Sequence, residues 1–390
     1  MNRRVGMEVS LAVAEAVKMA DTDAIAAYPI TPQTHIVERL SEFAAEGELH
    51  AAYIPVESEH SAISVCAGTS ASGARTFTAT SSQGLALMHE ILYIIASMRL
   101  PVVMAVVNRA LSAPINIWSD LSDVMSQRDT GWIVLFAESG QEAFDLTLQA
   151  FRAAEDPRVL LPVMVNVDGF SLSHVIESIE LPELEAVRDF LPTYSPRISL
   201  DPDRPVSIGA FAPPEVYTNI KYQQDRALRE SRQVLEEVWE QFGRRFGRRH
   251  RAVECHRIED AETVLMTMGS VCSTASVAVD RMRREGKRVG LLKVKLWRPF
   301  PAGDLMKAIR FADNVVVVDR ALSFGSQGGP LALEVKSASY SLARRPRFVE
   351  YIAGIGGLDL RVEDFQDMVE GAYREEIREN PPFSMVGVTE

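Results

Sequence analysis

The chain of 390 residues is longer than one hydrophobic core usually supports, which predicts two or three domains. Its net charge of −12 argues against nucleic-acid binding, and no apolar run approaches the ~18 residues of a membrane span. Cys66, Cys255 and Cys272 are too few and too scattered to build an iron–sulfur cluster, a structural zinc site or a disulfide framework, which fits a reducing cytoplasm.

The first part of the chain alternates strand and helix patterns. Strands are predicted at Ala24–Tyr28, Thr76–Thr80, Val102–Val107, Ile133–Ala137 and Leu160–Val167. Helices are predicted at Glu8–Met19, Thr34–Ala45, Ser58–Ser72, Leu85–Ser97 and Gln141–Ala154. The strands are apolar without in/out alternation, so we expect a parallel sheet covered by helices on both faces.

Prolines break this pattern between Leu181 and Tyr222, which predicts a linker laid over the surface. A polar helix is expected from Tyr222 to Phe246, ending in the basic run Arg244–Arg251. This run is either a solvated segment between domains or a contact for an anionic partner or ligand. The pattern leaves both interpretations open.

A second α/β domain is predicted from about Glu262. Its expected elements are strands at Thr263–Met268, Val289–Val294 and Asn314–Asp319, a helix at Ser273–Arg284 capped by Gly286, and a loop at Ser323–Gly329 that opens another helix. The chain is thus expected to form two parallel-sheet sandwich domains, residues 1–245 and 255–390. The tail Asn380–Glu390 is expected to pack on a neighbouring chain as an arm, or to fray.

The loop Tyr28–Gln33 directly follows a predicted strand and contains two prolines that fix its backbone. Ligands of open α/β sheets bind past the carboxyl ends of strands, so Thr31 is a candidate ligand-binding residue. The alternative is a rigid strand-to-helix turn with no ligand.

Polar groups also follow the other predicted strands, and all should meet at one sheet edge. Ser81–Gly84 and Arg109 suit a small carboxylate, because the guanidinium binds such groups and Gly84 permits close approach. Glu59 is a candidate proton relay, or else a partner of its helix dipole. Arg109 has a surface ion pair as its alternative, and His60 and His89 are interpreted as structural residues rather than metal ligands.

Several common motifs are missing. The sequence has no GxGxxG opening its first helix, no GxxxxGK[ST], no GxSxG, and no Gly-Asp-Gly stretch followed by Asn, which thiamine-diphosphate enzymes use for their metal. The chain therefore shapes a small-acid site without holding a cofactor diphosphate itself.

Short segments in order along nearly the whole chain carry a family resemblance. In the first domain they are Tyr28–Pro32, Val56–His60, Thr78–Gly84, Asn108–Leu111, Asn116–Asp120, Ser126–Gly131 and Asp168–Gly169. In the second domain they are Leu296–Pro301 and Gly354–Gly357. Together they resemble the alpha subunit of 2-oxoacid:ferredoxin oxidoreductases of the pyruvate synthase type.

The resemblance implies a pyrimidine-binding-type first domain and a transketolase C-terminal-like second domain. It implies oxidative decarboxylation of a 2-oxo acid with CoA, giving acyl-CoA, CO₂ and low-potential electrons. Thiamine diphosphate would be shared with a beta subunit that holds its Mg²⁺ and a proximal [4Fe–4S] cluster. Gamma and delta ferredoxin-like subunits, and ferredoxin or an NAD/FAD subunit as acceptor, would complete the system.

The resemblance also implies roles for individual residues. Glu59 would contact the aminopyrimidine across the subunit interface, and Thr31 and Arg109 would hold the substrate carboxylate and carbonyl. The residues expected around the cofactor are Pro29, Glu59, Ser82, Gln83 and Gly84, and those around the substrate are Thr31, Arg109, Ile115 and Asn116. No metal ligand is expected in this chain.

One segment departs from the family pattern. Ala113 and Ile115 stand where pyruvate-type members often carry Pro and Trp. The smaller side chain would admit a bulkier aryl or branched acid such as phenylglyoxylate or 2-oxoisovalerate. The alternative is that the substitution is neutral.

Two other functions compete. One is a non-catalytic scaffold with a dead thiamine-type fold, which the joint presence of Thr31, Glu59 and Arg109 disfavours. The other is a transketolase- or dehydrogenase-type thiamine enzyme, which the domain order, with no cofactor-diphosphate domain in the chain, disfavours.

Overall fold

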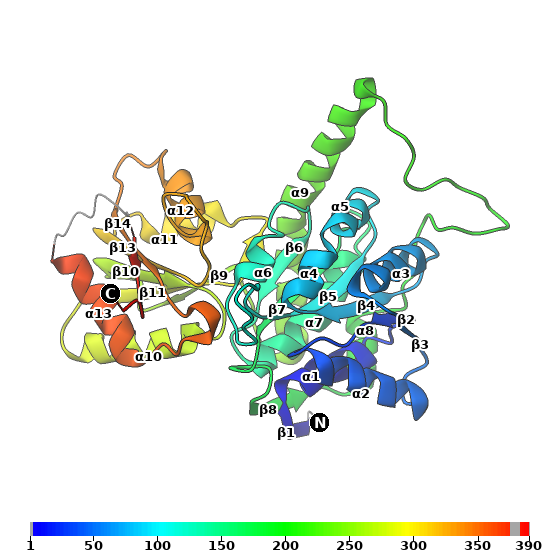
Figure 1. Ribbon diagram of the computed structural model, residues 1–390, viewed down its shortest axis with the longest axis horizontal. Coiled ribbons are helices and arrows are strands. Elements are labelled where there is room, and N and C mark those ends of the chain that lie inside the picture. The colour runs from blue at the N-terminus through cyan, green and yellow to red at the C-terminus, as the bar shows by residue number, and fades with distance from the viewer. Residues whose placement is uncertain (1–2, 375–382, 390) are drawn as a thin grey trace.

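The computed structural model describes residues 3–374 and 383–389 and contains two parallel-dominated sheets that lie side by side (Figure 1). The first sheet has the order β12 (Leu296–Arg298), β6 (Ile133–Phe136), β7 (Val163–Asp168), β5 (Val102–Asn108), β4 (Thr76–Thr80), β2 (Ala24–Ala27) and β3 (Ala52–Pro55). All neighbours are parallel except β12 and β6. The expected parallel sheet is confirmed, and β5 is buried along its whole length.

Helices cover both faces of the first sheet. Figure 1 shows α3, α4 and α5 over one face and α1 and α7 across the other. The bounds are α1 (Val9–Met19), α2 (Thr34–Ala45), α3 (Glu59–Ala71), α4 (Ser82–Leu87), α5 (His89–Ser97), α6 (Ser122–Met125) and α7 (Gly140–Ala154). The single helix expected at Leu85–Ser97 is therefore wrong. The chain bends at Met88 between α4 and α5.

A short antiparallel ribbon joins β1 (Arg3–Glu8) to β8 (Ile176–Leu181), and the sequence patterns predicted neither strand. The expected break from Leu181 onward is interrupted by α8 (Leu184–Phe190). Residues 191–213 are free of helix and strand apart from an isolated bridge between Asp201 and Arg204, as the prolines indicated. The long helix α9 (Pro214–Phe246) begins eight residues before its expected start.

Helix α9 rises out of the molecule, and the proline-rich segment runs away from its first turn (Figure 1). It ends at Gly247, whose left-handed φ of +76° glycine adopts without strain. Part of the basic run that follows is paired within the chain. Arg248 contacts Asp145 at 2.8 Å and Glu180 at 3.2 Å, and His250 contacts Asp145 at 3.0 Å.

The second sheet has the order β15 (Ser384–Met385), β14 (Arg347–Ile352), β13 (Asn314–Asp319), β10 (Thr263–Thr267), β11 (Val289–Val294) and β9 (Val253–His256). Its helices are α10 (Val271–Arg284), α11 (Ala302–Ile309), α12 (Pro330–Ser339), η1 (Ile355–Gly357) and α13 (Val362–Tyr373). In the tail, β15 pairs with β14 of its own chain, so the expected arm or frayed end is wrong there. Residues 380–382 and 390 of that tail lie outside the described residues.

One strand of the first sheet comes from a later part of the chain. The segment Leu296–Arg298 belongs to the part of the sequence expected to form the second domain, yet it adds β12 to the edge of the first sheet. Trp297 in this strand is fully buried, so the junction is a packed core rather than a flexible hinge. None of the helices in the described parts of the chain has the length and apolar character needed to cross a bilayer.

Candidate active site

The loops that follow β2 and β5 meet at the carboxyl edge of the first sheet through Arg109. Its Nη1 donates to the Thr31 carbonyl at 2.9 Å, and its Nε donates to the Asn116 carbonyl at 3.0 Å. The residue is 9% exposed, and no carboxylate in the described chain pairs with its guanidinium. The surface ion pair left open by the sequence is therefore not formed among these residues. A nearly buried, unpaired cation is a suitable receptor for a carboxylate ligand.

Glu59 lies at the first residue of α3, where the Ser58 side chain caps the helix by accepting from Ser61 N–H at 3.2 Å. Glu59 is 7% exposed, and no described residue donates a hydrogen bond to its carboxylate. Its Oε1 lies only 2.6 Å from the position that a Cβ on Gly84 would occupy. The absence of a side chain at Gly84 is therefore what makes room for this carboxylate. Such a buried carboxylate without a protein partner is suited to a ligand that donates a hydrogen bond.

The loop after β4 is held by its own hydrogen bonds. Ser82 adopts a left-handed φ of +45°, its N–H donates to Asp123 Oδ2 at 3.1 Å, and its hydroxyl contacts the Ala110 carbonyl at 2.6 Å. Gln83 Nε2 contacts the Ser112 carbonyl at 3.4 Å. Ser82 and Gln83 thus position the loop, while backbone and Gly84 face Glu59.

The remaining expected residues lie at the rim. Pro29, Thr31 and Ile115 are exposed, and Ile115 retains 80% of its accessible surface. Asn116 is held in place, since its Nδ2 donates to Gly356 O at 3.0 Å and its Oδ1 accepts from Trp118 N–H at 2.7 Å. These contacts fix the loop against the second sheet.

Sequence reasoning missed Asp123, which lies at the centre of the site and is fully buried. Its Oδ2 accepts from Ser82 N–H and Arg109 N–H, and its Oδ1 accepts from Asn108 Nδ2 and Val124 N–H, at 2.7–3.1 Å. Burial raises the pKa of Asp123 to about 7, although these donors pull it down. The segment Leu121–Met125 reads Leu-Ser-Asp-Val-Met, and its mixed polarity does not single out Asp123.

A second group, to which sequence reasoning assigned no individual role, ties the site to the other sheet. Asp168, at the end of β7, contacts Arg320 Nη1 at 2.6 Å and accepts from the Ser270 backbone and hydroxyl at 2.7 and 2.6 Å. Burial alone would raise the pKa of the Asp168 carboxyl, but Arg320 and the Ser270 hydrogen bonds lower it below its ordinary range. The two sheets are therefore joined by a buried ion pair beside the site.

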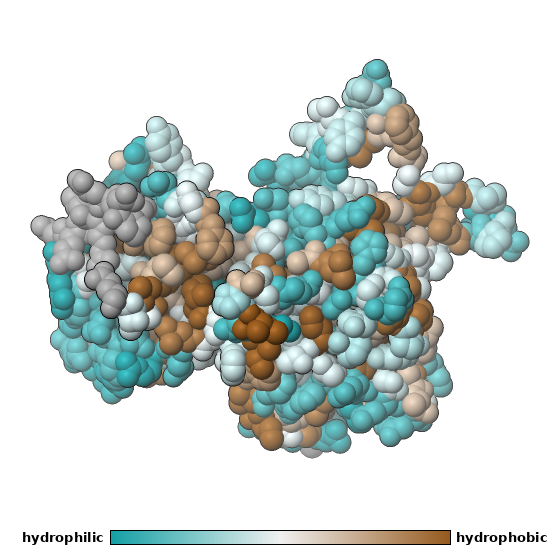
Figure 2. All heavy atoms as spheres, viewed as in Figure 1, coloured by the Kyte–Doolittle hydropathy of each residue, from teal (hydrophilic) through white to brown (hydrophobic). Residues whose placement is uncertain are grey.

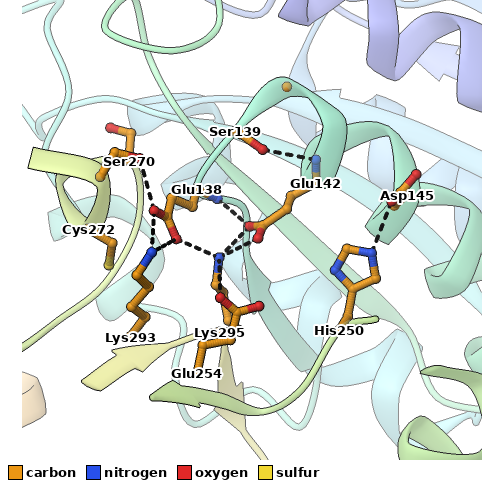
Figure 3. Close-up of polar contacts among 12 residues, drawn as sticks. Glu138, Ser139, Glu142, Asp145, His250, Glu254, Ser270, Cys272, Lys293 and Lys295 are labelled. Carbon is orange, nitrogen blue, oxygen red and sulfur yellow. Dashed lines mark hydrogen bonds and ion pairs between the residues drawn. The ribbon is translucent and has the colours of Figure 1, made fainter. Parts of the chain in front are cut away.

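A larger charge cluster lies further along the same junction (Figure 3). Lys295, between β11 and β12, contacts Glu142 at 2.6 Å and Glu138 at 2.9 Å, while Lys293 on β11 contacts Glu138 at 2.7 Å. Burial alone would lower the pKa of Lys295, but Glu142, Glu138 and Glu254 outweigh it and raise the pKa. The lysine ammonium groups occupy the space between the carboxylates. The cluster therefore holds the junction together through ion pairs and is not a cation site.

His60 and His89, interpreted from the sequence as structural residues, each have a polar neighbour. His89 Nδ1 contacts Gln127 Oε1, and His60 lies 3.8 Å from Glu90 on the surface. Neither belongs to a group of potential metal ligands among the described residues.

Comparisons with known proteins agree with the resemblance seen in the sequence. The family model of pyruvate flavodoxin/ferredoxin oxidoreductase, thiamine-diphosphate-binding, matches residues 15–240. The model of pyruvate:ferredoxin oxidoreductase core domain II matches residues 261–365.

Curated relatives match over nearly their whole length. Pyruvate synthase subunit PorA of Methanocaldococcus jannaschii is 47% identical over 368 residues, covering 94% of each chain. The Thermotoga maritima PorA is 48% identical over 373 residues, covering 94% of this chain and 95% of that protein. Ketoisovalerate oxidoreductase subunit VorA of Pyrococcus horikoshii is 45% identical over 361 residues, covering 92% of this chain and 91% of that protein.

Solved structures show the same fold. A 2-oxoglutarate:ferredoxin oxidoreductase from Magnetococcus marinus matches 94% of this chain with a TM-score of 0.73 at 21% identity, and this chain spans 65% of that chain's length. A split-gene transketolase matches 95% of this chain and 99% of that one, with a TM-score of 0.55 at 14% identity. The chain belongs to the pyruvate flavodoxin/ferredoxin oxidoreductase family and corresponds over its length to the PorA subunit of pyruvate synthases.

Proposed function

We propose that this chain is the alpha subunit of a thiamine-diphosphate-dependent 2-oxoacid:acceptor oxidoreductase that forms acyl-CoA and CO₂. The observation that carries the proposal is the presence, at the carboxyl edge of one sheet, of two buried side chains without an ion-pair partner in the described chain, Glu59 and Arg109. The names of the relatives, pyruvate synthase and ketoisovalerate oxidoreductase, support a 2-oxo acid as substrate.

The residues around Glu59 fit thiamine diphosphate. An aminopyrimidine edge would supply the hydrogen bond that the Glu59 carboxylate lacks within the chain, and Gly84 leaves the space beside it open. When bound, the cofactor supplies a nucleophilic carbon and an electron sink for decarboxylation. Glu59 would hold and move the proton at its Oε atoms.

Arg109 would bind the substrate carboxylate. Two of its N–H groups are already bonded to the Thr31 and Asn116 carbonyls, so the guanidinium is fixed in orientation before any ligand arrives. The Nη2 group has no acceptor in the described chain and is left for the ligand. The fixed orientation reduces the entropy lost when the substrate is positioned.

We infer that a beta subunit completes this site. Arg109 contacts, through the Asn116 carbonyl, the loop that carries the exposed Ile115 and Trp118, and Figure 2 shows apolar side chains on the surface where the two sheet regions meet. A covering chain would exclude water, which strengthens the electrostatic contacts of both charges. That subunit would also hold the cofactor diphosphate and Mg²⁺.

The iron–sulfur clusters are likewise assigned to partners, the proximal one to the beta subunit and others to ferredoxin-like gamma and delta subunits. Cys66 and Cys272 are buried on helices of different sheets, and burial raises the pKa of the Cys66 thiol to about 12. A cluster ligand must be a thiolate, so this thiol is a poor ligand. Ferredoxin, or an NAD/FAD subunit, would accept the electrons.

The proposal is tested with Glu59→Gln in the assembled complex, with Glu57→Gln as the matched control. Glu57 lies two residues earlier, is exposed, and bonds the Ser61 hydroxyl. We expect Glu59→Gln to lower 2-oxo-acid- and CoA-dependent dye reduction by about 10²–10⁴-fold. The control should keep wild-type turnover. A Glu59→Gln complex that binds thiamine diphosphate and turns over within about threefold of wild type would refute the role, given that range.

A further inference from the structure

Three residues from separate elements meet behind the Tyr28–Gln33 loop. Glu8 ends β1, His35 lies in the first turn of α2, and His174 follows β7. His35 Nδ1 lies 2.7 Å from Glu8 Oε1, and one potential ligand atom from each of the three residues lies within 4.8 Å of the others. This group is separate from Glu59 and Arg109 and takes no part in the function proposed above.

The backbone holds Glu8 and His174 side by side. Val9 N–H donates to Val175 O at 3.1 Å and Ser10 N–H donates to Ser173 O at 2.9 Å, which joins the end of β1 to the segment before β8. The Ser173 hydroxyl lies 2.8 Å from His174 Nδ1 and accepts from Phe170 N–H at 2.9 Å. The ring is thus fixed through Nδ1, and Nε2 is left for another partner.

Two imidazoles and one carboxylate form a common ligand set for divalent transition metals. We propose that Glu8, His35 and His174 bind one divalent first-row transition metal ion, such as Zn²⁺. Metal–ligand bonds of ~2.0–2.1 Å place tetrahedral ligands roughly 3.3 Å apart, so modest side-chain rotations close the site. The His35 side chain is 43% exposed, which gives the ion an entry path and leaves the fourth position to water.

The arrangement differs from the other acidic cluster. Glu138, Glu142 and Glu254 also lie within the same mutual distance, but Lys293 and Lys295 already form ion pairs with them. No lysine or arginine in the described residues pairs with Glu8. A simple ion pair would also need only one histidine, whereas a second imidazole lies 4.6 Å from the first, ring centre to ring centre.

The site would connect to the substrate loop. A row of rings runs from Trp118 to Phe170 at 6.5 Å, from Phe170 to His174 at 4.7 Å, and on to His35. His35 also lies four residues after Thr31. A bound ion would fix the first turn of α2 and, with it, the loop that carries Thr31.

The test uses the full chain without a polyhistidine tag, stripped with a chelator and titrated with Zn²⁺ by calorimetry. We expect one saturable site in the wild type and at least tenfold weaker binding in His174→Gln and His35→Gln. The matched control is His256→Gln, because His256 forms a similar pair with Asp280 at 3.0 Å but has no third potential ligand among the described residues. The control should bind Zn²⁺ as the wild type does.

A second measurement guards against misfolding of the variants. Zn²⁺ should raise the Tm of the wild type and of His256→Gln, and leave the Tm of His174→Gln unchanged, since binding to the folded state alone stabilises it. Absence of saturable binding in the wild type would overturn the proposal. Wild-type affinity in both His174→Gln and His35→Gln would also overturn it, because the ion would then bind elsewhere.

Discussion

Replacing Asp123 by Asn is expected to destabilise the fold although it preserves the shape of the side chain. Each carboxylate oxygen of Asp123 accepts two N–H groups. An amide offers only one oxygen, so its NH₂ group must face two donors in either orientation. An unsatisfied buried donor costs about 1–3 kcal/mol, which gives a loss of roughly 2–6 kcal/mol for the pair.

The measurement is denaturant unfolding of the wild type, Asp123→Asn and Asp129→Asn. Asp129 is a surface control with a side chain 72% exposed, and its replacement should change the free energy of unfolding by no more than about 0.5 kcal/mol. An Asp123→Asn variant that loses less than about 1 kcal/mol would refute the assigned hydrogen bonds.

Asp123→Asn should also change how the free energy of unfolding depends on pH. The pKa of Asp123 is raised to about 7 from an ordinary 3.8, so between these values the folded state holds a proton that the unfolded chain has released. The contribution of this proton to the free energy of unfolding is complete below the ordinary pKa of 3.8, and it is lost as the pH rises through about 7. Asp123→Asn should remove this part of the pH dependence. If the free energy of unfolding of Asp123→Asn has the same slope as that of the wild type between pH 4 and pH 7, the raised pKa of Asp123 is contradicted.

Three further substitutions follow from the site. Gly84→Ala should lower turnover of the assembled complex, because the added Cβ would lie 2.6 Å from Glu59 Oε1 and 2.5 Å from Thr80 Oγ1. Wild-type turnover of this variant would show that the Glu59 side chain has free space elsewhere. Lys295→Met should lower the free energy of unfolding by about 3–5 kcal/mol, since it leaves buried carboxylates without their cation. An unchanged free energy of unfolding would mean that the junction accommodates the unpaired carboxylates. Arg109→Lys should lower kcat/KM more than thiamine diphosphate affinity, because lysine lacks the planar fork; a loss of cofactor affinity alone would place Arg109 in the cofactor site.

The fold was largely predictable because its central strands carry a strong local signal. β4, β5 and β7 are buried on both faces, so their sequences are apolar without interruption and stand out between amphipathic helices. β3 was missed because only four half-exposed residues form it. β12 was missed because its partner β6 lies far away in sequence, and no local pattern specifies such a pairing.

The candidate site likewise contains residues that the sequence predicted and residues that it did not. Strand-end positions brought Thr31, Glu59 and Arg109 to one edge, as the parallel topology requires. Arg109 also contacts the backbone carbonyl of Thr31, and no sequence pattern indicates such a contact. Asp123 was not singled out, and Asp168 was named only within a segment that carries the family resemblance, because the roles of both carboxylates depend on donors that only the folded chain assembles.

Residue 115 provides a test of what sets substrate size. Its side chain is 80% exposed in this chain, so it can line a pocket only where the proposed beta subunit covers the site. In the assembled complex, Ile115→Trp should shift preference from bulky 2-oxo acids toward pyruvate. Apolar contacts discriminate by about 1–3 kcal/mol per methylene, so the kcat/KM ratio for 2-oxoisovalerate over pyruvate should change at least about tenfold.

The control for this substitution is Ile198→Trp, because Ile198 is 69% exposed in the proline-rich segment far along the chain. Both substitutions should leave the free energy of unfolding of the isolated chain within about 0.5 kcal/mol of wild type, since each side chain is already in solvent. A substrate ratio that Ile115→Trp leaves unchanged would remove residue 115 from the pocket. Substrate selection would then depend on the rigid loops held by Arg109 and Asp123, and on the partner that covers them.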